Sequence, residues 1–422
     1  MTVLAFLIGI VVLVVGLAAS IALHELGHLL PAKAFGVRVG QYMIGFGPTI
    51  ASWRRGETEY GVKALPVGGY ISMAGMYPAP ADGSRPVRTR LFAAMVQDAR
   101  DANRESMAGA EPHRMFSSLP IGKRVVIMLG GPVMNLLLAI VLMTTLMSGF
   151  GVQTATATVA SLSECTPTTM VSDVCEDGPT PAEAAGIRPG DRLVSVDGSP
   201  VATFADASAI IQRSANRSLP MVLDRGGELV PVTVTPVPVP SAASADAAEI
   251  GFIGIRPSVE PVREPLWSGA ATVVENTGAV ASVMVRLPVL IYEAGASVVT
   301  GQERDPDGPL SVVGAGAIAG EVAAADAPVR DRVAAMVGLL ASVNLALFVF
   351  NLIPLLPLDG GHVAIALWDG AARLFARLRG TAPPRPVDAT RLVPLTVAVV
   401  SLLIVMGGVL IVADLLNPVS LV

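Results

Sequence analysis

Two histidines and a glutamate near the N-terminus form the pattern best suited to chemistry in this sequence. The segment His24-Glu25-Leu26-Gly27-His28 spaces the histidines four residues apart. On a helix this spacing directs both imidazoles to one face, where they can hold one metal ion, and Glu25 stands beside them as a general base would. In a chain with 4 histidines, chance gives such a pattern in roughly one chain in a thousand. The motif therefore predicts a hydrolytic metal site.

A catalytic zinc site needs a third protein ligand and one open coordination position. Asp359 is the best-placed carboxylate, in the segment NLIPLLPLDGGH of residues 351–362. The prolines and glycines of this segment interrupt a helix, and irregular backbone is tolerated at membrane depth only where it is buried or lines a wet cavity. His362 is a rival third ligand, although a histidine beside a loop is just as often a surface residue.

The elements that must position these residues are membrane helices. The chain has 422 residues, of which 52% are apolar and 15% charged, whereas soluble domains have about 25% charged residues. This composition predicts a polytopic α-helical membrane protein, and we expect no nucleic-acid partner. Four apolar runs reach the ~20 residues that cross a bilayer: Val3–Leu29, Val125–Phe150, Val333–Leu358 and Leu392–Leu416.

The division of charge predicts the orientation of these spans. Residues 33–120 carry 11 Lys and Arg against 7 Asp and Glu, and residues 363–391 carry 5 against 2, whereas residues 150–332 carry 11 against 22. Because short cytoplasmic loops are rich in Lys and Arg, we expect 33–120 and 363–391 inside, and both termini with segment 150–332 outside. The motif and Asp359 then lie at similar depth, towards the cytoplasm.

The outer segment contains the chain's two cysteines and a recognisable small domain. Cys165 and Cys175 favour a disulfide, because that compartment is oxidising; two unpaired thiols are the alternative. Thr180–Val201 resembles the core of a PDZ domain, followed by a helix at 204–213, a hairpin at 221–234 and a closing strand at 250–255. PDZ domains add an extended peptide to a sheet edge and often hold its C-terminal carboxylate. A steric cap that binds no peptide is equally compatible with the sequence.

The remaining segments have weaker signals. Gly61–Met76, with the pair Gly68-Gly69, suits a β-hairpin, and residues 79–112 suit a flexible insertion. Residues 266–300 are amphipathic and suit a segment along the outer membrane face. Asp414, near the end of the last run, is most simply an interface residue. The predicted organisation is 1–32 first span, 33–120 cytoplasmic loop with a membrane-associated hairpin near 61–76, 121–150 second span, 151–258 PDZ-like domain, 259–332 membrane-surface linker, 333–362 third span, 363–391 cytoplasmic loop, and 392–422 fourth span with the C-terminus.

Taken together, these motifs resemble those of the site-2 protease family of intramembrane zinc proteases. The resemblance rests on the His-Glu-x-x-His motif, on Gly131-Pro132-Val133-Met134-Asn135 in the second span, and on residues 351–361 in the third. Among bacterial, PDZ-bearing members, the chain is most similar to actinobacterial homologues of the regulator of sigma-E protease. It differs from some members in having one PDZ-like domain rather than two.

The resemblance implies particular roles for individual residues. One Zn²⁺ would be held by His24, His28 and Asp359, with Glu25 as the general base. Asn351 would help to hold the substrate backbone, although it is equally suited to bracing the broken helix. The hairpin with Gly68 and Gly69 would pair with an unwound substrate; an ordinary cytoplasmic hairpin is the alternative. Gly131 and Asn135 could border the site, but small residues and amides commonly serve helix packing in membranes, which we favour.

The sequence thus predicts an intramembrane zinc metalloendopeptidase of a bacterial plasma membrane. Its partners would be the lipid bilayer and a single-span membrane protein cut in or near its transmembrane segment. In the resembling enzymes this substrate is an anti-sigma factor already cut once outside the cell. A catalytically silent PDZ scaffold and a metal transporter are the competing interpretations. Glu25 argues against both, since neither needs a base beside the metal.

Overall fold

The chain folds into two compact units, which we describe separately. The computed structural model describes residues 2–76, 111–170, 175–176, 178–241, 248–302, 304–305, 308–382, 387 and 389–419. The membrane unit combines Met1–Phe150 with Pro265–Val422, and the β-domain is Gly151–Glu264. The predicted insertion at 79–112 lies outside the described residues, apart from its last two.

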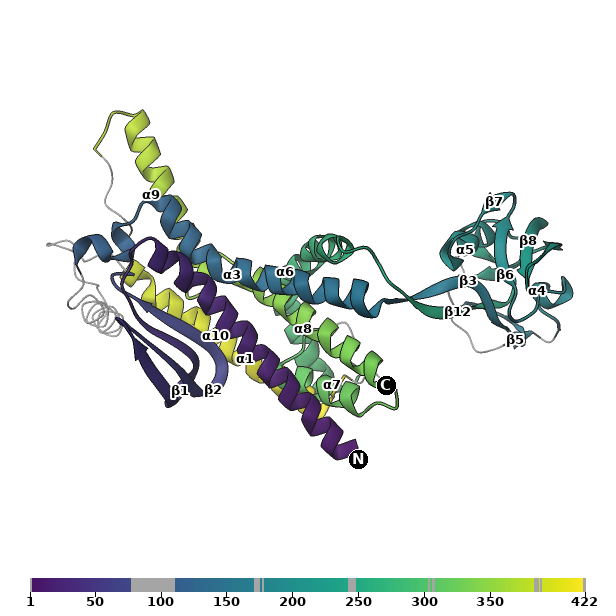
Figure 1. The fold of residues 1–422 in the computed structure, drawn as a ribbon, viewed down its shortest axis with the longest axis horizontal. Helices are drawn as coiled ribbons and strands as arrows, with labels where there is room; N and C mark the ends of the chain where they lie inside the picture. The colour runs from purple at the N-terminus through teal and green to yellow at the C-terminus, as the bar shows by residue number, and fades with distance from the viewer. Residues whose placement is uncertain are drawn as a thin grey trace. The chain divides into compact units, whose positions relative to one another are not determined.

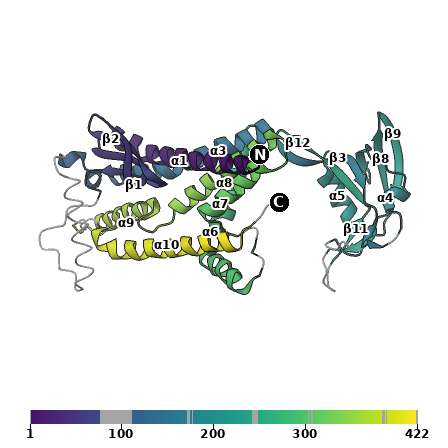
Figure 2. The same cartoon turned by 90° about the horizontal axis from the view of Figure 1, so that it is seen from below.

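Long helices dominate the membrane unit (Figures 1 and 2). Two strands and two short 3-10 helices follow the first helix, a π-helical turn continues α3, and another 3-10 helix precedes α10. In chain order the elements are α1 (Thr2–Ala34), β1 (Val39–Arg55), β2 (Thr58–Met73), η1 (Pro112–Arg114), η2 (Phe116–Ser118), α3 (Ile121–Thr144), η3 (Thr145–Phe150), α6 (Ser268–Thr300), α7 (Val312–Ala324), α8 (Val329–Asn351), α9 (Asp359–Leu378), η4 (Ala389–Leu392) and α10 (Val393–Leu416).

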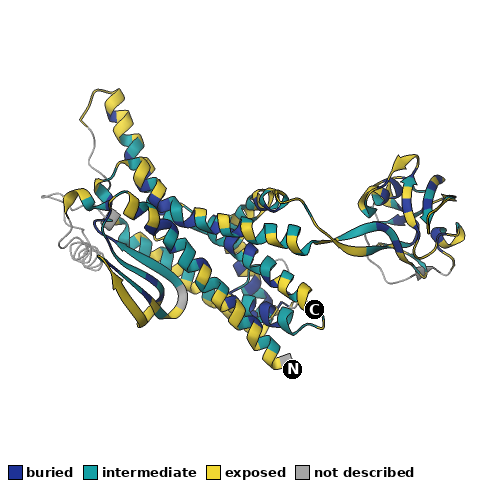
Figure 3. Cartoon of the chain, in the orientation of Figure 1, coloured by how far each residue is buried: buried dark blue, intermediate teal, exposed yellow. Residues whose placement is uncertain are grey.

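Five helices of the described chain are long and apolar enough to cross a membrane: α1, α3 with η3, α6, α8 and α10. The sequence predicted four spans, and the fifth candidate, α6, falls within the predicted surface linker at 259–332. A count of four is therefore not confirmed, whereas a helical membrane protein with an inserted β-rich domain is. Large apolar side chains such as Leu4, Val11 and Val15 are exposed on α1, and Figure 3 shows exposed residues along its outer face. Such faces suit lipid contact.

Helices α1 and α3 touch through two glycines. A Cβ atom added to Gly27 would lie 2.2 Å from the carbonyl oxygen of Gly130, and one added to Gly130 would lie 2.0 Å from that of Gly27. Only glycine allows backbones to approach so closely. This contact brings the face of α3 that carries Gly131 against the histidines of α1.

The predicted third span is broken between α8 and α9. Helix α8 ends at Asn351, and Asp359 lies in the first turn of α9 rather than at the end of α8. Pro354 and Pro357 lie in the break, where proline cannot continue the hydrogen-bond ladder of a helix. A Cβ atom on Gly360 would lie 2.4 Å from the Leu352 carbonyl oxygen. Gly360 therefore allows the irregular turn to fold back on the start of α9. Helix α9 also occupies much of the segment 363–391, which was predicted to be a loop.

Strands β1 and β2 form the sheet beside α1, with a turn at Gly56 and Glu57. The two long strands bend, so that Tyr42 pairs with both Ile71 and Tyr60. Of the segment 61–76, in which the sequence predicted a hairpin, residues 61–73 belong to β2 and pair with β1, and Gly68-Gly69 lies inside that strand.

The β-domain is a sheet with two short helices over a single core. The strand order is β12-β3-β6-β8-β9, and β7 pairs with β6. A helix and a hairpin lie where they were predicted, as α5 and β8–β9, whereas the segment 250–255 predicted as one closing strand is divided between β11 and the first residue of β12. The elements are β3 (Val152–Leu162), β4 (Thr166–Pro167), β5 (Cys175–Glu176), α4 (Pro181–Ala184), β6 (Arg192–Val196), β7 (Ser199–Pro200), α5 (Phe204–Gln212), β8 (Leu219–Arg225), β9 (Glu228–Val234), β10 (Val237–Pro240), β11 (Glu249–Phe252) and β12 (Ile255–Val262).

The first of the two cysteines is disulfide-bonded. Cys165 takes part in a disulfide, and Cys175 is the chain's one other cysteine. The backbone of Cys175 in β5 pairs with Pro167 in β4, two residues from Cys165. The side chain of Cys175 lies outside the described residues.

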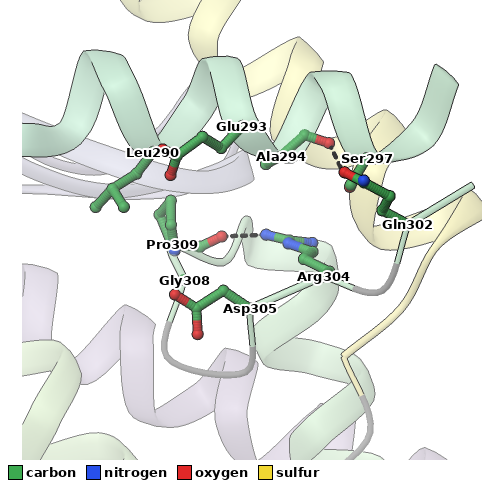
Figure 4. Close-up of a pocket in the computed structure, with 9 residues that line it drawn as sticks. All are labelled: Leu290, Glu293, Ala294, Ser297, Gln302, Arg304, Asp305, Gly308 and Pro309. Carbon is green, nitrogen blue, oxygen red and sulfur yellow. Dashed lines mark hydrogen bonds between the residues drawn. The ribbon is translucent and has the colours of Figure 1, made fainter. Parts of the chain in front are cut away.

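Asp414, near the end of α10, is buried in an ion pair. Its carboxylate pairs with Arg304, and the two side chains are 1% and 3% exposed. It also accepts hydrogen bonds from the backbone N–H of Ser311 at 2.7 Å and of Gly314 at 3.2 Å. Arg304 donates in addition to the carbonyl oxygen of Pro309, beside a cavity of about 180 Å³ (Figure 4). These contacts tie the end of α10 to the start of α7.

Candidate metal centre

The last turns of α1 hold His24, Glu25 and His28 in the buried interior of the membrane unit. The Nε2 atoms of the two histidines are 3.2 Å apart, as the four-residue spacing predicts. The side chain of His28 is 5% exposed and that of His24 is 13% exposed. Glu25 is also buried. Burying three polar side chains in so apolar a helix is costly, and such residues usually serve a function.

Asp359 meets both histidines from α9. Its Oδ2 atom lies 3.2 Å from His24 Nε2 and 3.3 Å from His28 Nε2. Three ligand atoms with these separations match three corners of a tetrahedron whose centre is about 2.0 Å from each, which is the zinc–nitrogen and zinc–oxygen distance in proteins. Two imidazoles and a carboxylate are also zinc's ordinary ligands. The residues present therefore fit a zinc ion with a fourth position left for a reactant.

No other such cluster occurs in the described part of the chain. Among those residues, His24, His28 and Asp359 are the one group of three or more potential ligands whose atoms converge, all within 4.8 Å. His362, the rival third ligand, is not in that group. His113, which lies in η1 between β2 and α3, is exposed and pairs with Glu111.

Helix α3 fixes the orientation of His28 and anchors α9. The Nδ1 atom of His28 is 2.8 Å from the carbonyl oxygen of Ile127, so Nδ1 carries the hydrogen and Nε2 is left free for a metal. At the start of α3, Arg124 donates to Asp369 of α9 over 3.3 Å, and both side chains are buried. The sequence reasoning missed both contacts. A backbone carbonyl has no sequence signal, but a lone arginine at the start of an apolar span could have been noted.

The sheet approaches the site at Glu25. A Cβ atom on Gly69 would lie 2.9 Å from Cγ of Glu25, so the β2 backbone passes directly over this side chain. Gly68 has a φ angle of +84°, which favours glycine. Tyr42 of β1 donates its hydroxyl hydrogen to the Ala22 carbonyl oxygen at 2.7 Å. Burial and the nearby Glu25 raise the pKa of Tyr42 to about 12, so the hydroxyl remains a donor.

Two further predicted residues have specific contacts. The side-chain amide of Asn351, the last residue of α8, donates to the Leu347 carbonyl oxygen in the same helix at 3.0 Å. Gly131, for which helix packing was favoured, lies against the site instead. A Cβ atom there would be 2.2 Å from Nε2 of His28.

A metal-ligand triad with an adjacent glutamate, built on apolar helices, defines the class of membrane-embedded metallopeptidases. The chain belongs to peptidase family M50, whose family model matches residues 12–382. This membership confirms the resemblance to site-2 proteases.

Characterised relatives match over nearly the full length. The chain is 33% identical to the zinc metalloprotease Rip1 of Mycobacterium tuberculosis over 99% of each chain. The Rip1 protein of Mycolicibacterium smegmatis has the same identity and coverage. The metalloprotease MmpA of Caulobacter vibrioides is 28% identical over 88% of each chain.

Proposed function

We propose that this chain is an intramembrane zinc metalloprotease that cuts single-span membrane proteins in or near their transmembrane segment. One Zn²⁺ is held by His24, His28 and Asp359, and Glu25 is the general base. The observation that carries the proposal is the meeting of His24 Nε2, His28 Nε2 and Asp359 Oδ2 at 3.2–3.3 Å beside Glu25. The names of the Rip1 relatives support zinc as the cofactor.

The residues around the ligands divide the chemistry among them. When bound, Zn²⁺ supplies a Lewis acid that polarises the scissile carbonyl and makes water more acidic. Glu25 takes the proton of the attacking water and returns it to the leaving amine. The Ile127 carbonyl keeps His28 in the tautomer that leaves Nε2 available, and Arg124 keeps α9, and with it Asp359, against α3.

A substrate helix must be extended before its backbone can reach this site, because its amides are otherwise held in hydrogen bonds. The strand around Gly68 and Gly69 supplies a backbone edge next to Glu25 to which an extended segment can pair. Asn351 lies at the end of α8, and its amide can exchange the Leu347 carbonyl for a substrate carbonyl. A cut anti-sigma factor is the class of substrate that we propose.

Four crossings and a bacterial plasma-membrane location complete the proposal, with both termini and the β-domain outside and the active site towards the cytoplasm. Contacts of α6 support this count. The first turn of α6 packs against the C-terminal end of α3, which is the end farther from the histidines. A Cβ atom added to Gly269 would lie 2.4 Å from the backbone nitrogen of Thr144. Beyond its last turn, the Gln302 carbonyl accepts a hydrogen bond from Asn417, just after α10. Both ends of α6 thus lie at the bundle end away from the metal ligands.

The β-domain is proposed to be a PDZ-like domain that receives a peptide C-terminus or excludes uncut substrates. Its helix α5 and strands β11 and β12 border a cavity of about 130 Å³. Phe204, Ile211 and Phe252 are among the apolar residues that line it. A disulfide between Cys165 and Cys175 suits the oxidising side of the membrane.

Replacement of Glu25 tests the mechanism. In Glu25→Gln we expect bound zinc to remain at one ion per chain, while cleavage of a model single-span substrate falls by a factor of at least 10², the typical contribution of a general base. Asp359→Ala should lose the metal as well. The measurements are zinc content by elemental analysis of purified protein and product formation in nanodiscs.

His113→Ala is the matched control, because His113 is exposed and does not belong to the ligand group. It should keep both zinc and activity. Undiminished cleavage by Glu25→Gln would exclude Glu25 as the base. Zinc retention in Asp359→Ala would remove Asp359 from the ligand set.

A further inference from the structure

The two histidines differ in what their second ring nitrogen contacts. In His28, Nδ1 is held by the Ile127 carbonyl of α3. In His24, Nδ1 is equally buried but has no hydrogen-bond partner among the described residues. Because both rings direct Nε2 towards Asp359, the Nδ1 of His24 must carry a hydrogen when Nε2 binds a metal. Metal-binding histidines almost always donate that hydrogen to an acceptor.

An acceptor without a donor lies on the adjacent helix. The amide oxygen of Asn135 in α3 is buried and unpartnered in the described structure, and the residue is 1% exposed. Burying a polar atom without a partner costs about 1–3 kcal/mol. A hydrogen bond from His24 Nδ1–H to the Asn135 amide oxygen would remove the cost of burying either group without a partner.

The register of the helices brings these two groups to the same level. Helices α1 and α3 run antiparallel, because Ile127 contacts His28 whereas Gly131 approaches both histidine rings. Ile127, Gly131 and Asn135 follow one another at intervals of four and share one face of α3. The Ile127 carbonyl points along α3 towards Asn135, and the Asn135 side chain tilts back towards Gly131. The Ile127 carbonyl oxygen and the Asn135 amide oxygen therefore lie on either side of the histidine pair along α3.

We propose that Asn135 is the positioning residue of His24, in that its amide oxygen accepts the Nδ1–H hydrogen bond directly or through a single water molecule. Helix α3 then supplies the outer partner of both histidines, from Ile127 for His28 and from Asn135 for His24. The inference rests on the ligand set of the proposed function. It assigns to Asn135 a role in metal affinity in place of the helix packing that the sequence favoured.

Asn344 of α8 is a built-in comparison. It is also fully buried, and its amide oxygen is also unpartnered in the described structure. However, its amide nitrogen is engaged by Ser20 at 2.9 Å and by the Leu340 carbonyl oxygen at 2.8 Å. The hydrogens of its amide nitrogen are thus committed to Ser20, one turn before His24 on α1, and to α8 itself. Loss of its amide should affect helix packing alone.

The test is zinc affinity of the purified full-length protein in nanodiscs, measured by competition with a chelator. Asn135→Leu should weaken zinc binding by roughly 10- to 100-fold, the usual effect of removing an outer partner. Asn135→Asp, which keeps an acceptor oxygen, should stay within a few-fold of the wild type. Asn344→Leu should bind zinc as the wild type does, although its melting temperature falls.

Three outcomes would overturn the proposal: wild-type affinity in a folded Asn135→Leu protein, equal weakness in Asn135→Leu and Asn135→Asp, or weakened binding in Asn344→Leu alone. If the leucine variant does not fold, Asn135→Ala replaces it, because alanine is smaller and also removes the acceptor oxygen, and unchanged affinity would again refute the assignment. His24→Ala is measured alongside. Wild-type affinity in that variant would refute the ligand set itself, whatever Asn135 does.

Discussion

Gly131 shows how a residue without a side chain can control a metal site. A Cβ atom there would lie 2.2 Å from Nε2 of His28 and 2.8 Å from Cε1 of His24, closer than unbonded atoms can approach. The constraint comes from the neighbouring rings, since the backbone of Gly131 is ordinary helix. Any side chain would have to displace the rings that hold the proposed metal ion.

Gly131→Ala should therefore weaken zinc binding by more than about tenfold and abolish cleavage, because a misplacement of about 1 Å at a reacting centre can cost 10²-fold. Chelator competition and a cleavage assay measure the two effects. Gly122→Ala, in the same helix, is the control, because nothing lies within 4 Å of its added Cβ atom. Its effect should be neutral or slightly stabilising, since alanine favours helix by about 0.5–1 kcal/mol. Equal zinc affinity in the two variants would contradict this assignment.

Among single residues, the sequence predicts those whose side chains are themselves reactive or metal-binding. The types and spacing of His24, Glu25 and His28 are sufficient to nominate a metal site, and Asp359 follows from its unusual Pro-rich and Gly-rich surroundings. The Ile127 carbonyl and the clearance at Gly131 depend on where another helix crosses α1. Such contacts follow from tertiary packing, which residue type alone does not encode.

Elements whose ends are marked by local signals were predictable, and those set by distant partners were not. In the β-domain, Asp197-Gly198 and Gly226-Gly227 mark tight turns, with positive φ angles at all four residues. Their flanking strands accordingly lie where expected. Residues 61–73 pair with β1, the strand before them in the chain. The sequence of β1 does not alternate apolar with polar residues, so it has no local signal of a strand. The start of α9 at Asp359 is likewise set by how its glycines pack on the preceding turn.

The β-domain should lose stability in acid through Asp191. Arg225 donates two hydrogen bonds to this buried carboxylate, at 2.7 and 2.8 Å. The Arg225 guanidinium and the backbone N–H of Arg188 hold the pKa of Asp191 below its usual value. A lowered pKa contributes stability above the unfolded-state value of about 4, and the contribution disappears as pH falls through the lower native value. Hydrogen exchange of β6 and β8 amides in the full-length protein, followed from pH 7 to pH 3, measures the loss.

Asp191→Asn should destabilise these strands at pH 7 by roughly 1.5–3 kcal/mol, the range for hydrogen bonds to charged groups, and should flatten the acid dependence. Asp197→Asn is the comparison, because the Asp197–Arg217 pair is exposed and such pairs contribute at most about 1 kcal/mol. If the β-domain of Asp191→Asn still loses stability in acid, that loss must come from groups other than Asp191.

For the whole membrane unit, the path of α6 decides how many times the chain crosses the bilayer. If both ends of α6 lie on one side, cysteines introduced by Trp267→Cys and Val299→Cys should both react with an impermeant maleimide applied to intact cells. Both positions are highly exposed, as is Leu378 at the end of α9. Leu378→Cys should react only after the membrane is permeabilised.

Labelling at Trp267→Cys without labelling at Val299→Cys would mean that α6 crosses, and the four-span topology would be wrong. The sequence predicted a surface segment here from its amphipathic pattern, although α6 also has the length of a span. Only its contacts with Thr144 and Asn417, which are far from each other in the chain, distinguish the two paths.

The distance along the chain between the metal ligands has a consequence for biosynthesis. His24 and Asp359 are 335 residues apart (359 − 24), and the break between α8 and α9 makes Asp359 part of a late element. A ribosome must therefore complete more than four-fifths of the polypeptide before the third ligand exists. Until then the emerging α1 presents two histidines and a base but no complete site. With the proposed ligand set, the metal site is therefore completed only late in synthesis, after most of the membrane unit has been made.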